Sequence, residues 1–185
     1  PEGALPALEA LAPGIAMFVA YWHALEHHTV PADTRLWVSG VESWRRLAAR
    51  GFWVEGCGDN LGFGDVCATL ASPVLGLPPL DEWTALTYRW AVPGWRDSGI
   101  GSVIATYDII PPVDGEELRR LEASAAHATH FYWSSPEQFR ALRAAVPANA
   151  HHACGAGKTL RALRAAGIDA QPFPNGREWQ RWMNA

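Results

Sequence analysis

Two short segments of the chain combine glycine with a hydroxyl residue in a way that suits anion binding. The first is Gly40-Val41-Glu42-Ser43 and the second is Gly155-Ala156-Gly157-Lys158-Thr159. Each follows an apolar, strand-like run and precedes a helical pattern, so its backbone N–H groups would lie at the positive end of a helix dipole. Such a junction holds a carboxylate or phosphate, although the same residues can serve only as helix caps and tight turns.

A pair of serines adds a third junction. Ser134-Ser135-Pro136-Glu137 offers a serine cap, a proline in the first turn and a capping-box glutamate for the following helix. The segment from Gly155 to Thr159 also invites interpretation as a P-loop, but that motif needs a further glycine where the chain has His152, and no acidic strand for Mg²⁺ is evident. The pattern therefore favours a general anion site over a nucleotide site.

Histidines and cysteines give weaker signals. Two groups of histidines could ligate a metal: one is His23, His27 and His28, and the other is His127, His130, His151 and His152. Neither group has the carboxylate or cysteine of a recognisable zinc pattern, so we expect solvent-facing or hydrogen-bonded side chains rather than metal ligands. Cys154, at a strand end, is expected to be a small buried residue rather than a reactive thiol.

Composition excludes several classes of protein. The chain has 185 residues, of which 49% are hydrophobic and 18% charged, with a net charge of −4, as in ordinary globular proteins. Its basic residues are scattered, so no field attracts nucleic acid or an anionic membrane. The longest apolar run, Ile15 to Trp22, is far short of the ~20 residues that span a bilayer. Three cysteines without C-x-x-C spacing are typical of a cytoplasmic protein.

Apolar runs alternate with amphipathic stretches, which predicts an α/β fold with parallel strands. The predicted strands are Ile15–Ala20, Arg35–Ser39, Phe52–Glu55, Trp83–Tyr88, Val103–Ile110, His130–Trp133, His151–Cys154 and Ala170–Phe173. Apolar residues at helical spacing predict two helices, over Glu42–Arg50 and Pro136–Val146. Gly51 and Gly167 occupy positions typical of left-handed helix caps.

The order of these elements repeats within the chain. Aligning Gly40 with Gly155 places Phe18 on Trp133 without a gap, and one residue of slip then aligns Gly51 with Gly167. Two copies of a strand–helix unit predict two similar lobes, residues 1–106 and 116–185, with an inter-lobe crossing at 107–115. The proline-rich stretch from Ile110 to Gly115 suits that crossing because it can continue neither a helix nor a central strand.

Three elements resemble uroporphyrinogen-III synthase in order and spacing. They are Val103-Ile104-Ala105-Thr106-Tyr107-Asp108 followed by Pro111-Pro112, then Phe131-Tyr132-Trp133-Ser134-Ser135-Pro136, then Gly155-x-x-x-Thr159-x-x-x-Leu163-x-x-x-Gly167. The first copy repeats the last element as Gly40-x-x-Ser43-x-x-x-Leu47-x-x-x-Gly51. The likeness extends over nearly the whole chain.

The resemblance implies two α/β lobes joined by a two-stranded crossing, with substrate between them. Enzymes of this family close linear hydroxymethylbilane into uroporphyrinogen III with inversion of the last ring, and they use no cofactor. The substrate carries eight carboxylates, which suit backbone donors at helix starts. By motif position Tyr107 matches a possible proton donor for loss of the hydroxyl, and Ser135 and Thr159 match substrate-binding hydroxyls.

The chain departs from the family in the first copy and at its start. The family's Thr-Ser strand end is replaced by Val19-Ala20, followed by the bulky Tyr21-Trp22, and nothing corresponds to the N-terminal strand–helix segment that completes the second lobe. A second hypothesis therefore stands beside the enzyme: a synthase-like module that binds a polycarboxylate tetrapyrrole or a partner without catalysis, within a longer fused chain. The sequence leaves the oligomeric state open.

Overall fold

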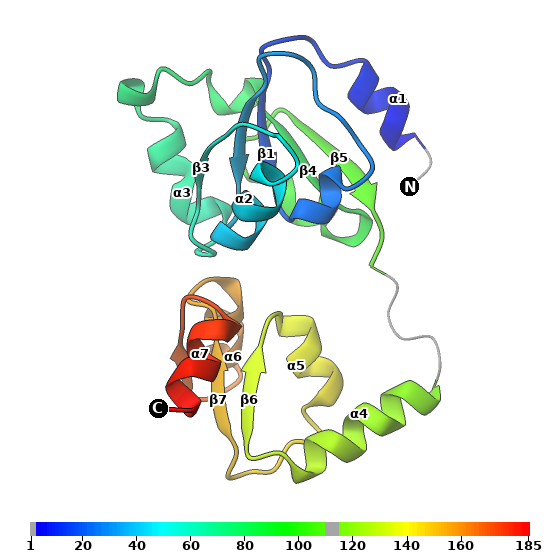
Figure 1. The fold of residues 1–185 in the computed structure, drawn as a ribbon, viewed down its shortest axis with the longest axis vertical. Coiled ribbons are helices and arrows are strands. Elements are labelled where there is room, and N and C mark those ends of the chain that lie inside the picture. Colours follow the sequence, from blue (N-terminus) through cyan, green and yellow to red (C-terminus); the bar gives the residue numbers. More distant parts are fainter. Residues whose placement is uncertain (1–2, 110–114) are drawn as a thin grey trace. The chain divides into compact units, whose positions relative to one another are not determined.

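A computed structural model describes residues 3–109 and 115–185 and divides the chain into two compact units, Pro1–Ile109 and Ile110–Ala185. The fold is α/β, with a five-stranded and a three-stranded parallel sheet, each flanked by helices (Figure 1). Residues 110–114 of the predicted crossing lie outside the described residues. Within the described ranges, no helix is long and apolar enough to cross a membrane.

The first unit contains the five-stranded sheet. Its strands are β1 (Ala16–Val19), β2 (Arg35–Val38), β3 (Val54–Cys57), β4 (Thr84–Tyr88) and β5 (Ser102–Tyr107), in the spatial order β3-β2-β1-β4-β5. The order reverses at β1, which pairs with β2 on one side and β4 on the other: Met17 lies opposite both Leu36 and Thr84. Ligands of open α/β sheets bind outside the carboxyl ends of the strands near such a reversal.

Helices cover both faces of this sheet. The α-helices are α1 (Ala4–Glu9), α2 (Val41–Ala48) and α3 (Phe63–Leu70), and the 3₁₀ helices are η1 (Trp22–Leu25), η2 (Pro73–Leu75), η3 (Leu80–Glu82) and η4 (Arg89–Trp95). Met17 and Val19 pack in one core with residues of α1 and α2, whereas Ala16 and Phe18 pack in a second core with α3. Burial on both faces explains why β1 is continuously apolar.

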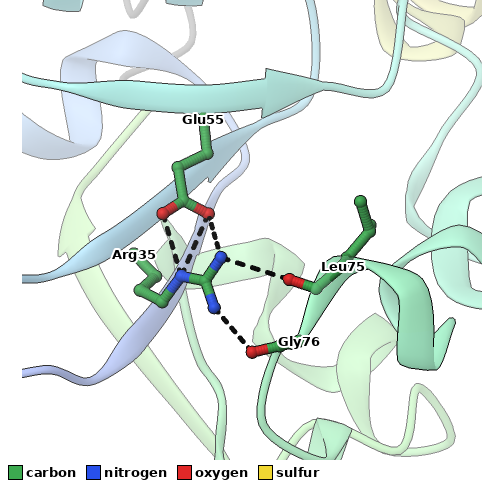
Figure 2. Close-up of polar contacts among 4 residues, drawn as sticks. All are labelled: Arg35, Glu55, Leu75 and Gly76. Carbon is green, nitrogen blue, oxygen red and sulfur yellow. Dashed lines mark hydrogen bonds and ion pairs between the residues drawn. The ribbon is translucent and has the colours of Figure 1, made fainter.

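Arg35, the first residue of β2, joins the sheet to the chain after η2 (Figure 2). Its Nε donates to both carboxylate oxygens of Glu55 on β3, at 2.8 and 3.1 Å, and its Nη2 donates to Oε2 at 3.0 Å. Nη1 donates to the Gly76 carbonyl at 2.7 Å, and Nη2 lies 3.4 Å from the Leu75 carbonyl oxygen. The planar guanidinium thereby connects two strands and a loop.

The second unit contains the three-stranded sheet. Its strands are β6 (His130–Trp133), β7 (His151–Cys154) and β8 (Ala170–Pro172), in the order β6-β7-β8, and its helices are α4 (Gly115–His127), α5 (Pro136–Leu142), α6 (Lys158–Ala165) and α7 (Gly176–Met183). Trp133 and Cys154 face a core that includes Phe139 of α5 and Leu163 of α6. Tyr132 points to the opposite face, where its ring lies 5.7 Å from that of Trp179 on α7.

The predicted repeat appears as a shared topology. β1-β2-β3 and β6-β7-β8 are each parallel, with α2 or α6 between the second and third strands. Gly51 and Gly167 follow these helices with φ of 87° and 77°, the left-handed caps that their positions predicted.

All eight predicted strands are confirmed: β6 and β7 have the predicted bounds, and the other six differ at one or both ends. The predicted end of the fifth strand, Ile110, lies outside the described residues. β3 begins two residues after the predicted start because Phe52 N–H bonds to the Leu47 carbonyl and completes the α2 cap. α5 ends at Leu142 rather than at Val146, which precedes Pro147 and is disfavoured in a helix for that reason. Val146 still packs against the core of its unit.

Candidate functional site

A pocket of about 380 Å³ opens at the carboxyl ends of β1 and β5, the two strands that flank β4. It contains Tyr107, the residue that the sequence analysis assigned to catalysis, together with side chains that follow β1. Its lining residues are Tyr21, His23, Glu26, His27, His28, Thr106, Tyr107, Asp108 and Ile109. Parallel pairing brings both strand ends to the same edge of the sheet.

Tyr107 sits beside an irregularity in β5. Ala105 pairs with Thr87 and Tyr107 with Tyr88, so Thr106 is an extra residue of the kind found in β-bulges near active sites. The Tyr107 ring lies 5.9 Å from the Tyr88 ring and 6.2 Å from the His23 ring. Burial, reinforced by the Tyr88 and Tyr21 phenols, raises the pKa of Tyr107 far above its usual value, so the phenol stays protonated at neutral pH.

A histidine–glutamate pair forms the wall opposite Tyr107. His23 Nδ1 lies 2.5 Å from Glu26 Oε2, and the His23 ring stacks on Trp22 with 3.7 Å between ring centroids. The hydrogen bond from His23 lowers the pKa of Glu26, outweighing desolvation, which acts in the opposite direction; the nearby His27 and Arg50 add to the lowering. Glu26 is thus an ionised acceptor that fixes Nδ1 as the donor nitrogen of His23.

Helix α2 and the turn that follows it hold this wall in place. The buried Ser43 Oγ accepts a hydrogen bond from Trp22 N–H at 3.2 Å. Arg50 donates from Nη1 to the Leu25 carbonyl at 2.7 Å and from Nη2 to the Glu26 carbonyl at 2.8 Å. Arg46 lies over the Trp22 ring, 4.5 Å from its centroid. These contacts fix η1 and the histidine that it carries.

Two polar atoms of the pocket are buried without a hydrogen-bond partner among the described residues. They are Thr106 Oγ1, on a side chain that is 6% exposed, and His28 Nδ1. Buried polar atoms in native proteins almost always have a partner, which can be water or a ligand. Asp108 has one, because Arg89 Nη2 lies 3.1 Å from its Oδ2.

The first predicted anion junction is closed by its own neighbours. Gly40 is buried, and a Cβ atom at this position would lie only 2.0 Å from Asn60 Oδ1, so the Asn60 side chain fills the space beside the glycine. Ser43 is 2% exposed and engaged by Trp22. Neither residue lines the Tyr107 pocket, and Ser43 contacts its wall through Trp22.

The second unit gathers the remaining predicted residues at the carboxyl ends of β6 and β7. Ser135 is the N-cap of α5: its Oγ accepts from Gln138 N–H at 3.2 Å. Ser134 donates to Gln138 Oε1 from N–H at 3.1 Å and from Oγ at 2.7 Å. The reach-back side chain is therefore Gln138, and the prediction of Glu137 for this role was wrong because the cap falls one residue later.

The Gly155–Thr159 segment joins β7 to α6. Gly155 is half-buried, Ala156 and Lys158 are exposed, and Gly157 and Thr159 are buried. Desolvation opposes ionisation of Glu137, but its own backbone amide, Lys158 and Arg140 outweigh that effect and lower its pKa. The starts of α5 and α6 are thus electrostatic neighbours. The first amides of α6 have no carbonyl partner within the helix, and no side chain caps its start.

In the second unit, His152 is engaged within its sheet and Cys154 is part of the core. No cluster suited to a metal ion occurs within residues 3–109 and 115–185. His152 Nδ1 accepts from Trp133 Nε1–H at 3.0 Å, and burial lowers the pKa of His152. Cys154 is fully buried, and desolvation raises its thiol pKa despite the opposing effect of Arg164.

No protein-family model matches the chain, and no curated protein matches it significantly. The pairing of His23 with Glu26 was missed by the sequence analysis, which expected a solvent-facing or hydrogen-bonded His23 rather than a metal ligand but named no partner for it. The sequence did contain an indication of this pair, because His23 and Glu26 are three positions apart, and this spacing brings side chains together on one helical turn.

Proposed function

We propose that the chain is a uroporphyrinogen-III synthase or a close relative, which cyclises hydroxymethylbilane to uroporphyrinogen III with inversion of the last ring and without a cofactor. The observation that carries the proposal is the position of Tyr107, in a pocket at the carboxyl ends of β1 and β5. The proposal includes a two-stranded crossing between two lobes and a cytoplasmic location.

The chemistry of the pocket suits the first step of such a reaction. A volume of about 380 Å³ is near the lower limit of small-molecule sites and holds one substituted pyrrole ring rather than a whole linear tetrapyrrole. The protonated phenol of Tyr107 can donate a hydrogen bond to the hydroxyl of the terminal hydroxymethyl group. Positioning this reactive end against the far end of the chain supplies the remaining rate advantage.

The second unit would bind carboxylates of the substrate. Lys158 and the backbone of Gly155, Ala156, Gly157 and Thr159 are the donors that this proposal assigns there. Ser134 and Ser135 contribute by ordering the start of α5, since their hydroxyls are engaged by Gln138. Ser43 contributes through its hydrogen bond with Trp22 N–H, and Gly40 makes no direct contact with the substrate because Asn60 fills the space beside it.

The test is an isomer assay with freshly generated hydroxymethylbilane. The porphyrinogens are oxidised to porphyrins, and the type I and type III isomers are separated. We expect the protein to produce type III in proportion to its concentration, and Tyr107→Phe to reduce the rate by about 10²-fold or more. Formation of the spontaneous type I isomer alone would refute the proposal.

The non-catalytic module is a second candidate, and the closed first junction favours it. With Gly40 covered by Asn60 and Ser43 engaged by Trp22, the first copy lacks the open anion site that duplication predicts. Such a module quenches its tryptophan fluorescence on binding uroporphyrin but produces no type III isomer. Absence of both quenching and turnover would exclude it as well.

A further inference from the structure

His23 is the pocket residue best placed to exchange a proton with a ligand. Its Nδ1 is committed to Glu26 Oε2 at 2.5 Å, which leaves Nε2 as the nitrogen for a bound molecule. Its ring is held on one side by Trp22 and lies 6.2 Å from the Tyr107 ring, between centroids. A base oriented by a carboxylate is the arrangement that recurs in acid–base catalysis.

Tyr107 alone is poorly matched to proton transfer at neutral pH. A general acid works best when its pKa lies near the working pH, and burial moves the pKa of Tyr107 in the wrong direction. The phenol is suited instead to donating a hydrogen bond without giving up its proton. A second group in the same pocket can carry the proton, and the His23 imidazole is the one whose ring nitrogen is bonded to a carboxylate.

The other ionisable groups of the pocket are less suitable than His23. Asp108 is engaged by Arg89, and His27 is exposed. His28 has an orphaned Nδ1 and no carboxylate bonded to its ring. Among the described residues of the pocket, only His23 has a ring nitrogen bonded to a carboxylate.

We propose that His23, oriented by Glu26, is the catalytic acid–base residue of the Tyr107 pocket, with Tyr107 as its hydrogen-bonding partner on the substrate. This inference rests on the proposed function. Protonated His23 gives its Nε2 proton to the terminal hydroxyl oxygen; the C–O bond breaks, its electron pair leaves with the oxygen as water, and the pyrrole nitrogen stabilises the cationic carbon. After the new C–C bond forms, Nε2 accepts the proton that the ring carbon releases on regaining aromaticity.

The pH dependence of catalysis reports on the pair. Ionisable groups around His23 come from its own segment, from the end of β5 and the residue after it, and from the turn after α2. They are Glu26, Tyr21, His27, His28, Tyr107, Asp108 and Arg50. Glu26 stabilises the imidazolium, so Glu26→Gln shifts the alkaline limb of the kcat profile to lower pH. Glu26→Asp keeps the charge and restores part of the wild-type profile. A purely structural role for Glu26 would leave the limb in place.

The experiment measures type III formation by the full chain from pH 6 to 9 for the wild type, His23→Gln, Glu26→Gln and Glu26→Asp. His127→Gln, an exposed histidine at the end of α4, is the matched control and should behave as the wild type. We expect His23→Gln to reduce kcat by about 10²–10⁴-fold with a smaller change in KM. Free imidazole should restore part of the rate to His23→Ala.

The outcomes separate this inference from the proposed function. A wild type that forms type III and a His23→Gln variant within twofold of it would overturn the role of His23 while leaving the function intact. A wild type that forms only type I would overturn both. Circular dichroism shows whether His23→Gln is folded. If it is not, the pH profile of Glu26→Gln is the deciding measurement, because the Glu26 side chain is 38% exposed and its replacement removes little packing. An alkaline limb at the wild-type pH would then overturn the role of the His23–Glu26 pair.

Discussion

Replacing Ser43 with alanine tests whether this residue supports the pocket or binds a ligand. Its hydroxyl is the acceptor for Trp22 N–H at 3.2 Å, and the residue is 2% exposed, so water has little access to replace the lost partner. An unsatisfied buried donor costs about 1–3 kcal/mol. Because Trp22 is only partly buried, we expect Ser43→Ala to lower the free energy of unfolding by about 1–2 kcal/mol.

Urea unfolding followed by tryptophan fluorescence measures this change. Ser102→Ala is the control, because Ser102 is exposed at the start of β5 in the same unit, and it should alter stability by less than about 0.5 kcal/mol. A Ser43→Ala variant as stable as the wild type, but with reduced kcat/KM, would refute the structural role. The hydroxyl would then be a ligand, as the sequence pattern predicted.

Three further changes test other parts of the structure. Burial raises the pKa of Tyr107 above its unfolded value near 10, so the folded state holds its proton longer and loses stability as pH rises past 10, by up to about 1.4 kcal/mol per pH unit. Urea titrations at pH 9 and 11 should therefore show a smaller fall in the free energy of unfolding for Tyr107→Phe than for the wild type. An equal fall in both proteins would argue against burial of the Tyr107 phenol. Leu163→Ala, at a fully buried position, should cost the second unit about 2–5 kcal/mol and reduce amide protection in β6–β8 but not in β1–β5, and unchanged protection would contradict the assigned core. Arg35→Lys retains the charge but not the planar guanidinium that contacts Glu55 and the Gly76 carbonyl. We therefore expect the free energy of unfolding to fall by about 1.5–3 kcal/mol and proteolysis near Gly76 to become faster. Cleavage at the wild-type rate would show that these contacts are dispensable.

Strand positions were predictable because each strand buries a short apolar run. β1 is buried on both faces, and its residues Ala16–Val19 are all apolar. The spatial order of the strands was not predictable from these runs, since the pairing of β1 with β4 depends on contacts distant in sequence. Strand ends also depended on neighbours: the two-residue shift of β3 follows from the Phe52–Leu47 hydrogen bond, which no apolar pattern encodes.

Tyr107, which the sequence analysis assigned to catalysis, lines a pocket, but the sequence pattern did not indicate which residues surround it. Parallel strands bring their carboxyl ends to one edge, but the sequence does not say which loop turns toward which strand. The hydrogen bond between His23 and Glu26, and the contact of their segment with Tyr107, arise from the fold of the chain after β1. Ser43 illustrates the reverse case, in which a hydroxyl at a helix start is consumed by packing.

The most direct test follows an isotope in the last pyrrole ring of hydroxymethylbilane. With carbon-13 placed in that ring, the product's nuclear magnetic resonance spectrum distinguishes an inverted ring from one that kept its orientation. We predict that the wild-type chain yields the inverted product and that Tyr107→Phe yields it far more slowly. A labelled product with an uninverted ring at every protein concentration would contradict the assignment of synthase activity to the Tyr107 pocket.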